Sequence, residues 1–396
     1  MSWHRFLRGL GAGACLAWLL TACGGGGTTV TDTSGADGDV TLDLPGHFPQ
    51  PQAAADNRLT AAKVELGRFL FYERRLSGNG QQSCSSCHQQ DKAFTDGLAS
   101  SVGSTGMTHP RNAQSLGNVV YNATLTWAGP ALVALESQML VPIFGTDPVE
   151  MGVNDGNSEE VLGRLRADSG YVARFSQAFP EAVGGSEPLI NWQRVVQSIA
   201  SFQRTLITGR SKFDEYRAGR VQLTAQEERG RVLFFGEKAE CFHCHGSFNF
   251  NDQVVHAGSR PGFIETPFHN TGLYNIDGRG AFPEPNRGLF ETTFAPGDMG
   301  RFRAPSLRNV EVTGPYMHDG SIRTLEDVLD FYAAGGRLIA SGPYAGDGRL
   351  NPFKSELVSR INLNSQEKAD IVAFLRTLTD HAFLTDPRFS DPAAGR

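Results

Sequence analysis

The stretches Cys84-Ser85-Ser86-Cys87-His88 and Cys241-Phe242-His243-Cys244-His245 decide the fold of this 396-residue chain. Each is a Cys-x-x-Cys-His run, in which two thiols can attach a haem through thioether bonds and the histidine can ligate its iron. After Cys23, every cysteine of the chain belongs to one of these two runs. A redox dithiol or a split zinc site therefore explains the two runs less well. The sequence therefore predicts two covalently bound c-type haems.

The first residues are typical of an exported bacterial lipoprotein. Arg5 and Arg8 precede an apolar stretch that is too short to span a membrane, and Leu20-Thr21-Ala22-Cys23 has the form of a lipoprotein cleavage site. We expect 1–22 to be a signal peptide and 23–44 a flexible tether on the periplasmic side of the cell envelope, with the cysteine lipidated as the only membrane anchor. An ordinary cleaved signal that leaves this cysteine free is the alternative.

The charge of the chain limits the kinds of partner it can have. Its formal net charge is −6, and removal of the two arginines with the signal peptide would make it −8. This balance argues against nucleic acid as a partner. It leaves room for a small basic redox protein or for another exported protein as the substrate.

Similar segments flank the two Cys-x-x-Cys-His runs. Residues 66–71, Leu-Gly-Arg-Phe-Leu-Phe, resemble residues 229–234, Arg-Gly-Arg-Val-Leu-Phe, and Phe94-Thr95-Asp96 resembles Phe250-Asn251-Asp252. We interpret this as an internal repeat of one haem-binding unit. The expected parts are an N-terminal cytochrome c domain, 45–207, a polar linker, 208–222, a C-terminal cytochrome c domain, 223–384, and a tail, 385–396.

The fold class predicted from the apolar pattern is mainly α, with long loops that wrap the cofactors. Apolar residues recur with helical spacing in both halves of the chain. Thr224 and Glu227 form a capping box, which predicts a helix that starts just before the second repeat unit. The expected buried faces are Val195, Ile199, Phe202 and Leu206 in the first half, and Ile371, Phe374, Leu375 and Leu378 in the second.

Two further motifs extend the pattern, Arg303-Ala304-Pro305-Ser306-Leu307-Arg308-Asn309 and Thr313-Gly314-Pro315-Tyr316-Met317-His318-Asp319-Gly320. Together with the two haem-attachment runs they resemble the bacterial di-haem cytochrome c peroxidase and MauG family, over nearly all of the chain after the signal. The resemblance implies a peroxide-reactive haem held by His88 in the N-terminal domain. It also implies an electron-transfer haem held by His245 in the C-terminal domain.

A calcium ion between the two domains is a further implication of the resemblance. The family pattern places the side chain of Asn112 and the backbone carbonyls of Thr313 and Pro315 around it. These are hard oxygen ligands of the kind that calcium prefers. A plain loop could carry the same residues, because carbonyl ligands leave no signature in a sequence.

The first haem is expected to have an open coordination site. In the family's peroxidases a histidine after the first run closes this site until reduction releases it. Counting back from Asn112 places Ser104 at that position, and serine cannot replace the histidine as a ligand. The competing interpretation is that Met107 or His109, a few residues further along, supplies the sixth ligand.

Peroxide cleavage needs an acid/base beside the open site. Glu150 resembles the family's acid/base, with Gln138 and Pro142 as its neighbours in the pocket. Asp147 remains a rival, because the spacing is slightly longer than in the family. Trp127 resembles the tryptophan that lies between the two haems and mediates electron transfer, and a plain core position is the alternative.

The distal ligand of the second haem separates the subfamilies. Counting from His318, this position falls on Tyr332, where cytochrome c peroxidases carry methionine and MauG carries tyrosine. Helical spacing alone would place Tyr332 in a core with Leu325 and Leu329. A thioether favours ferrous iron, whereas a phenolate favours ferric and higher states. The tyrosine therefore indicates a haem that stores oxidising equivalents.

The resemblance thus implies a MauG-like oxidoreductase that uses hydrogen peroxide to form a high-valent di-haem state and oxidises a tryptophan of a partner protein. The run from Trp127 through Gly152 is most similar to the MbnH-type branch. The surface tryptophan that MauG carries two positions before its second haem run is Ala239 here, so the electron path to the partner must differ. The alternatives are a cytochrome c peroxidase that takes electrons from a small cytochrome c, and a di-haem electron-transfer cytochrome.

Overall fold

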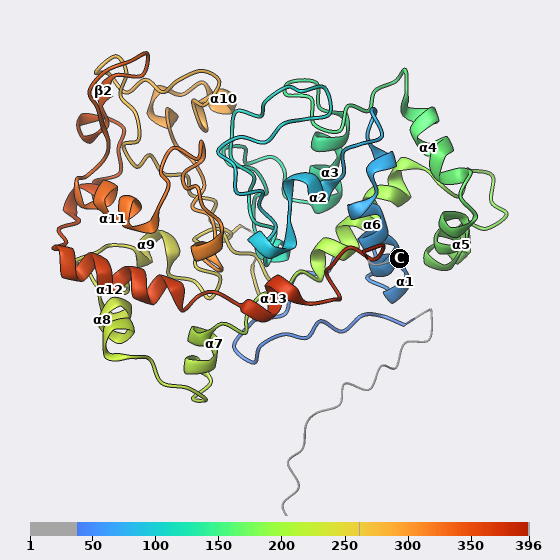
Figure 1. Ribbon diagram of the computed structural model, residues 1–396, viewed down its shortest axis with the longest axis horizontal. Helices are drawn as coiled ribbons and strands as arrows, with labels where there is room; N and C mark the ends of the chain where they lie inside the picture. The colour runs from blue at the N-terminus through green and yellow to red at the C-terminus, as the bar shows by residue number, and fades with distance from the viewer. Residues whose placement is uncertain (1–37, 261, 395–396) are drawn as a thin grey trace, which may run out of the picture. The chain divides into compact units, whose positions relative to one another are not determined.

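The structure is a computed structural model, which describes residues 38–260 and 262–394 (Figure 1). The expected signal peptide, Cys23 and most of the tether lie outside these residues and stay predictions. Within the described residues, helices and loops make up nearly all of the structure, which confirms the mainly α class. None of the described helices is both long enough and apolar enough to cross a bilayer.

The helices are short, and two of them, α2 and α9, are single turns formed by the Cys-x-x-Cys-His runs. The described sheet is one antiparallel pair of two-residue strands, β1 Leu338–Ile339 and β2 Gly346–Asp347. In chain order the α-helices are α1 Ala61–Tyr72, α2 Cys84–Cys87, α3 Leu135–Phe144, α4 Ser158–Arg166, α5 Ser169–Ala178, α6 Trp192–Arg204, α7 Lys212–Arg217, α8 Ala225–Phe234, α9 Phe242–His245, α10 Phe290–Thr293, α11 Leu325–Ala333, α12 Ser365–Arg376 and α13 His381–Thr385.

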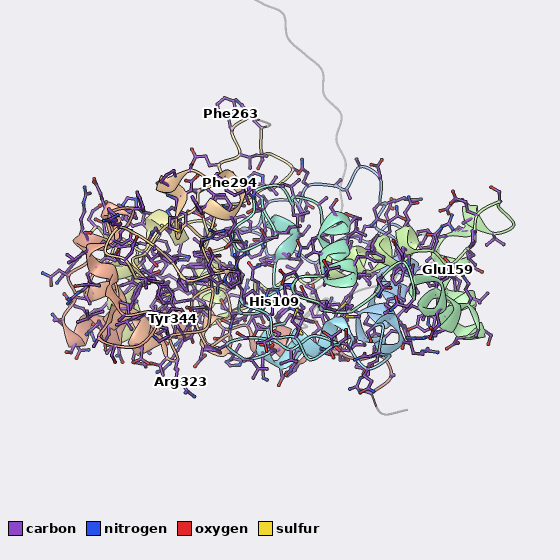
Figure 2. The ribbon with its side chains drawn as sticks, turned by 90° about the horizontal axis from the view of Figure 1, so that it is seen from above. His109, Glu159, Phe263, Phe294, Arg323 and Tyr344 are labelled. Carbon is purple, nitrogen blue, oxygen red and sulfur yellow. The ribbon has the colours of Figure 1, made fainter. Side chains whose placement is uncertain are left out.

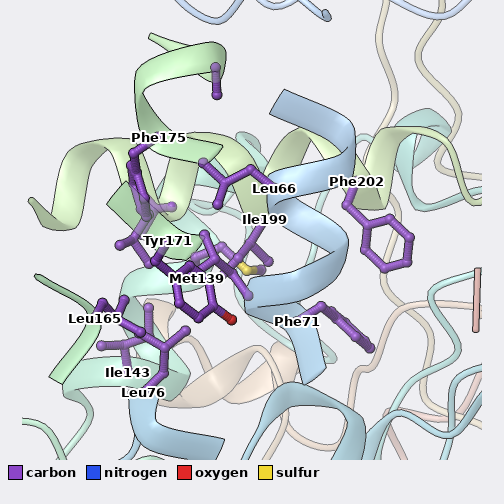
Figure 3. Packing of buried hydrophobic residues seen from close by; sticks show 14 of the residues in the cluster. Leu66, Phe71, Leu76, Met139, Ile143, Leu165, Tyr171, Phe175, Ile199 and Phe202 are labelled. Carbon is purple, nitrogen blue, oxygen red and sulfur yellow. The ribbon is translucent and has the colours of Figure 1, made fainter. Parts of the chain in front are cut away.

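One hydrophobic core surrounds α1 and α6, which cross and pack against each other (Figure 3). The face predicted from spacing is buried on α6 at Val195, Ile199 and Phe202. Leu66 and Phe71 of α1 pack against it, and residues of α3, α4 and α5 complete the cluster. Burial of these apolar side chains is the main source of stability in this part of the chain.

A second core lies around α8 and α12, which pack against each other (Figure 1). The predicted face of α12 is buried at Ile371, Phe374 and Leu375. The predicted capping box is present, since the side chains of Thr224 and Glu227 each accept a hydrogen bond from the other's backbone N–H. This cap satisfies two donors at the start of α8 that have no partner inside the helix.

Both helix pairs approach each other at a glycine. A Cβ on Gly67 of α1 would lie 1.9 Å from the backbone oxygen of Ser198 in α6, and a Cβ on Gly230 of α8 would lie 1.9 Å from that of Asp370 in α12. The two glycines hold the same place in the two segments that resemble each other in the sequence. Only a residue without a side chain permits backbones to come this close.

We expect Gly67→Ala to lower the free energy of unfolding by about 1–3 kcal/mol, the usual cost of overpacking a core. The added carbon meets backbone atoms of α6, which cannot rotate away. Gly163→Ala in α4 is the matched control, because a Cβ there meets nothing within 4 Å. This control is expected to raise stability by about 0.5–1 kcal/mol. Denaturant unfolding of the haem-loaded protein measures both changes, and a neutral Gly67→Ala would contradict the close contact.

The segment expected to be a polar linker, 208–222, is partly helical and anchored. It contains α7, whose Asp214 pairs with Arg308 at an N–O distance of 2.9 Å, with both side chains almost completely buried. The His47 Nε2 atom lies 3.0 Å from the same carboxylate. A sequence pattern of polar residues does not distinguish such a buried ion pair from a solvated segment, which is why the anchoring was not foreseen.

The expected tail, 385–396, packs against the first half of the molecule as far as it is described. Phe389 is buried in the first core together with Phe383 of α13. The Tyr72 hydroxyl at the end of α1 donates to the Phe389 carbonyl at 2.7 Å. The C-terminal residues therefore join two parts of the chain that are far apart in sequence.

Candidate active site

The first Cys-x-x-Cys-His run lines an internal cavity, with Cys84, Cys87 and His88 all facing it. The His88 Nδ1 atom donates to the carbonyl of Phe94 at 2.7 Å, which fixes the ring and leaves Nε2 available to a ligand. Burial lowers the pKa of His88, so that the imidazole is neutral. A neutral, oriented imidazole is the form that ligates a metal.

The second run lines another cavity in the same way, through Cys241, Cys244 and His245. Here the Nδ1 atom of His245 donates to the carbonyl of Phe250 at 2.9 Å, and burial again lowers the histidine pKa. Phe94 and Phe250 both adopt positive φ values, 63° and 54°. This uncommon backbone shape turns each carbonyl back toward its histidine.

Both cavities have the chemistry that a covalent haem requires. Each offers two thiols and one neutral imidazole. Buried polar atoms without a partner also face them, namely Gln138 Oε1 in the first, His318 Nε2 in the second, and the Nε and Nη1 atoms of Arg303, which lines both. Such atoms are rare in folded proteins, so they fit a bound group that supplies their partners.

The residues expected to handle peroxide come together in the first cavity. Gln138 and Pro142 of α3 and the loop residue Glu150 all line it. The Met151 N–H donates to the Pro142 carbonyl at 2.9 Å, which ties the loop that carries Glu150 to the helix. The side chain of Glu150 is 32% exposed, so the carboxylate lies where both water and a small ligand can reach it.

The rival carboxylate, Asp147, is exposed and does not line the cavity. The two alternatives for a sixth ligand do line it, and both contact the Glu150 loop. The Sδ atom of Met107 accepts from the Val149 N–H at 3.3 Å. His109, labelled in Figure 2, places Nε2 at 3.5 Å from the Glu150 Oε1 atom. Of the two carboxylates, Glu150 therefore lines the first cavity and Asp147 does not.

Ser104, the position expected to hold the family's histidine, lies beside the cavity and is not part of its lining. Its backbone N–H donates to the Glu150 carbonyl at 2.7 Å, and its own carbonyl accepts from Asn79 at 2.6 Å. Ser104 therefore supports the backbone of the Glu150 loop. Its hydroxyl supplies no ligand to the cavity.

A small group of residues lines both cavities, namely 112–115, Trp127 and Arg303. The Trp127 Nε1 atom donates to the Asn112 carbonyl at 2.8 Å, and the Trp127 carbonyl accepts from the Arg303 N–H at 2.8 Å. The indole is half-buried and lies between the cavities, as expected for a residue that mediates electron transfer. Trp127 also packs against a cluster of buried apolar residues, so its role in electron transfer stays a prediction.

Tyr332 of α11 faces the second cavity together with His245. Burial raises the pKa of Tyr332. Within the described chain its hydroxyl has no hydrogen-bond partner. Leu325 and Leu329 lie on the same helical face and also line the cavity, so the apolar spacing of α11 serves the cavity and the core together.

The three residues expected around calcium lie near one another. The Asn112 Nδ2 atom donates to the Pro315 carbonyl at 3.2 Å, and Thr313 lines the same cavity as Pro315. An amide oxygen and two backbone carbonyls suit calcium. A bound ion would require the amide of Asn112 to turn its oxygen inward, so calcium stays a prediction.

Three polar residues of the second cavity had no role in the sequence-based interpretation, namely Arg303, His269 and His318. The ring of His318 stacks on Phe302 with centroids 3.6 Å apart, and burial lowers its pKa to about 3. The His269 Nε2 atom lies 2.5 Å from Asp252 Oδ2. Arg303 and His318 belong to the two motifs quoted above, which was the one available sign that they belong to a site.

Two cavities that each contain a Cys-x-x-Cys-His run, with a carboxylate in the first and a tyrosine in the second, are those of a di-haem oxidoreductase of the peroxidase type. Residues 61–222 match the model of the di-haem cytochrome c peroxidase family. The chain is 34% identical over 379 residues to methylamine utilization protein MauG of Methylorubrum extorquens, covering 94% of both chains. It is 35% identical over 379 residues to cytochrome-c peroxidase IdrP1 of Denitromonas iodatirespirans, covering 91% of this chain and 92% of the relative.

Among solved structures, the chain is similar to the crystal structure of a MauG-like protein associated with microbial copper homeostasis, with a TM-score of 0.86 and 56% identity. The match covers 89% of this chain and 99% of the other. The chain therefore belongs to the di-haem cytochrome c peroxidase and MauG family. Membership of this family implies two c-type haems and hydrogen peroxide as the oxidant.

Proposed function

We propose that the chain is a MauG-like enzyme that uses hydrogen peroxide to oxidise a partner protein, with a tryptophan as the oxidised residue. The observation that carries the proposal is Tyr332, which brings a phenol into the second cavity where cytochrome c peroxidases have a methionine. The 56% identity to a MauG-like protein supports it. A bound c-type haem supplies peroxide reduction and one-electron transfer.

In the first cavity, His88 would hold a haem through its Nε2 atom, and the haem would supply the reduction of peroxide. Glu150 accepts a proton from the incoming peroxide and returns it to the leaving oxygen. Gln138 orients the peroxide through its side-chain amide, whose oxygen has no other partner. Pro142 has no N–H and presents only its ring, so it limits the water that enters. Two electrons and two protons convert one peroxide to two waters.

The second cavity stores and passes on the oxidising equivalents. His245 and Tyr332 would hold the second haem, and an anionic phenolate favours the oxidised states of a bound metal. Trp127, which lines both cavities, carries electrons from the second to the first. The two electrons come from the partner protein, which is thereby oxidised.

The partner must deliver electrons by a route other than that of MauG. Ala239 is 0% exposed and lies in the second core, so no surface residue stands at that position. Two aromatic side chains, Phe263 and Phe294, are 81% and 72% exposed and project from loops of the C-terminal half (Figure 2). Exposed aromatic residues are typical of protein interfaces, and we propose them as contacts for the partner.

We also propose that the enzyme acts on the periplasmic side of the cell envelope, anchored by a lipid on Cys23 as the first residues suggest. The MauG-like protein of known structure is associated with copper homeostasis. By analogy, a small exported protein that handles copper is the candidate partner. The 22 residues before Cys23 would be absent from the mature protein if this proposal holds.

Electron paramagnetic resonance of the resting ferric protein tests the arrangement of the two haems. One high-spin and one low-spin signal are expected, because the first haem has an open site and the second is closed by Tyr332. Two low-spin signals would contradict the open site and would indicate that Met107 or His109 is a ligand of the first haem. They would also favour an electron-transfer cytochrome.

The second candidate function is a cytochrome c peroxidase, which the 35% identity to IdrP1 favours. Addition of peroxide together with a reduced small cytochrome c separates the two functions. Slow oxidation of the cytochrome, with rapid oxidation of a tryptophan in the partner, is expected for the MauG-like enzyme. Fast turnover with the cytochrome would overturn the first proposal and establish the second.

A further inference from the structure

The side chain of Arg303 is buried between the two cavities and lacks a counter-ion. The residue is 4% exposed and lines both cavities. Its Nη2 atom donates to the side-chain oxygen of Gln114, whereas Nε and Nη1 have no hydrogen-bond partner. A guanidinium is always charged and offers five N–H donors, so burial without an anion is costly.

No carboxylate of the described residues lies within 4.0 Å of this guanidinium. The carboxylate of Asp252 acts on Arg303 from a greater distance; its Oδ2 atom lies 2.5 Å from His269 Nε2, and its buried Oδ1 atom has no hydrogen-bond partner. Other buried or half-buried arginines do have such partners, since Arg308 pairs with Asp214 and Arg111 pairs with Glu291. Arg303 therefore differs from these arginines, and its free Nε and Nη1 donors are open to a partner from outside the protein chain.

The backbone holds this guanidinium in a fixed place. The Arg303 N–H donates to the Trp127 carbonyl at 2.8 Å. The preceding residue, Phe302, forms a two-way bridge with His269, with N–O distances of 2.8 and 2.9 Å. Because the backbone is anchored at Phe302 and Arg303 and Nη2 donates to Gln114, the side chain is positioned before any ligand arrives.

The anion that fits is part of the cofactors. Each haem carries two propionate groups, which are carboxylates at the edge of an otherwise apolar ring. Arginine and carboxylate form short, forked hydrogen bonds of the strongest kind in proteins. We propose that Arg303 is the shared counter-ion of both haems, with its free Nε and Nη1 donors binding propionate oxygens that enter from the two cavities.

This role has a consequence for the redox properties of both cofactors. A fixed positive charge stabilises the reduced form of each iron, which carries one positive charge less than the oxidised form. Removal of the charge should lower both reduction potentials. The inference depends on the two haems that the family implies and is independent of which partner the enzyme oxidises.

Redox titration of the haem-loaded protein, followed by absorption, tests the proposal with two variants. In Arg303→Gln we expect both potentials to fall, with at least a tenfold change in each one-electron equilibrium constant, about 59 mV. Arg303→Lys keeps the charge and loses the fork, so a smaller fall is expected. Arg111→Gln is the matched control, because Arg111 lines only the first cavity and is already paired with Glu291. Its effect should be small and confined to the first haem.

Unchanged potentials in Arg303→Gln with both haems attached, or a change in only one haem, would overturn the proposal. A crystal structure of the unaltered haem-loaded protein gives a check that does not depend on a variant folding. A propionate oxygen of each haem is expected within about 3.2 Å of the Arg303 guanidinium. A chloride or water molecules in that place, with the propionates directed elsewhere, would show that the charge has another partner.

Discussion

Glu150→Gln is expected to slow the reaction of the ferric protein with hydrogen peroxide by about 10²–10⁴-fold, the usual contribution of a positioned acid/base. Glutamine keeps the size and the polarity of the side chain but cannot accept and return a proton. Glu150 lines the first cavity beside Gln138 and Pro142, and its loop is held by hydrogen bonds from Ser104 and Met151. The substitution should therefore leave the shape of the cavity unchanged.

Stopped-flow absorption at a single pH measures this rate, and the spectrum before mixing reports that both haems are attached. Asp147→Asn is the matched control, since Asp147 lies three residues earlier, is exposed and does not line the cavity. It is expected to react at the rate of the unaltered protein. A loss in Asp147→Asn instead of Glu150→Gln would make the rival carboxylate the acid/base. A loss in neither would point to His109, whose Nε2 atom lies 3.5 Å from Glu150.

Local signals in the sequence predicted much of this arrangement. The Cys-x-x-Cys-His runs line the two cavities. They could be recognised in the sequence because their cysteines and histidine lie within one turn of the chain. The capping box at Thr224 and the helical face around Ile199 are also present, since each depends only on neighbouring residues. Trp127, Glu150 and Tyr332 lie in the cavities expected from the family resemblance.

What could not be predicted depends on contacts between distant parts of the chain. The ion pair of Asp214 with Arg308 lies in a segment that looks like a solvated linker. The residues next to Arg303 in the sequence do not reveal that its guanidinium lacks an anion. This depends on where every carboxylate lies in the folded chain. One sign was present, since Arg303-Ala304-Pro305-Ser306-Leu307 resembles Asn112-Ala113-Gln114-Ser115-Leu116, and both segments line the cavities.

Tyr332→Phe is the second change with a large expected effect, namely complete loss of the peroxide-induced absorption change at the second haem. The phenol is the only proposed ligand on that side of the iron, and phenylalanine cannot replace its oxygen. In the resting protein, the low-spin resonance signal should change at the same time.

Tyr316→Phe provides the contrast, since Tyr316 lines the same cavity but its hydroxyl donates to the Val310 carbonyl at 3.0 Å. Loss of this bond should cost about 1 kcal/mol of stability and leave the resonance signal as it was. If Tyr332→Phe instead keeps both the signal and the absorption change, Tyr332 is a core residue. The second haem would then need another ligand, and the main support for oxidation of a partner protein over peroxide reduction by a small cytochrome would be gone.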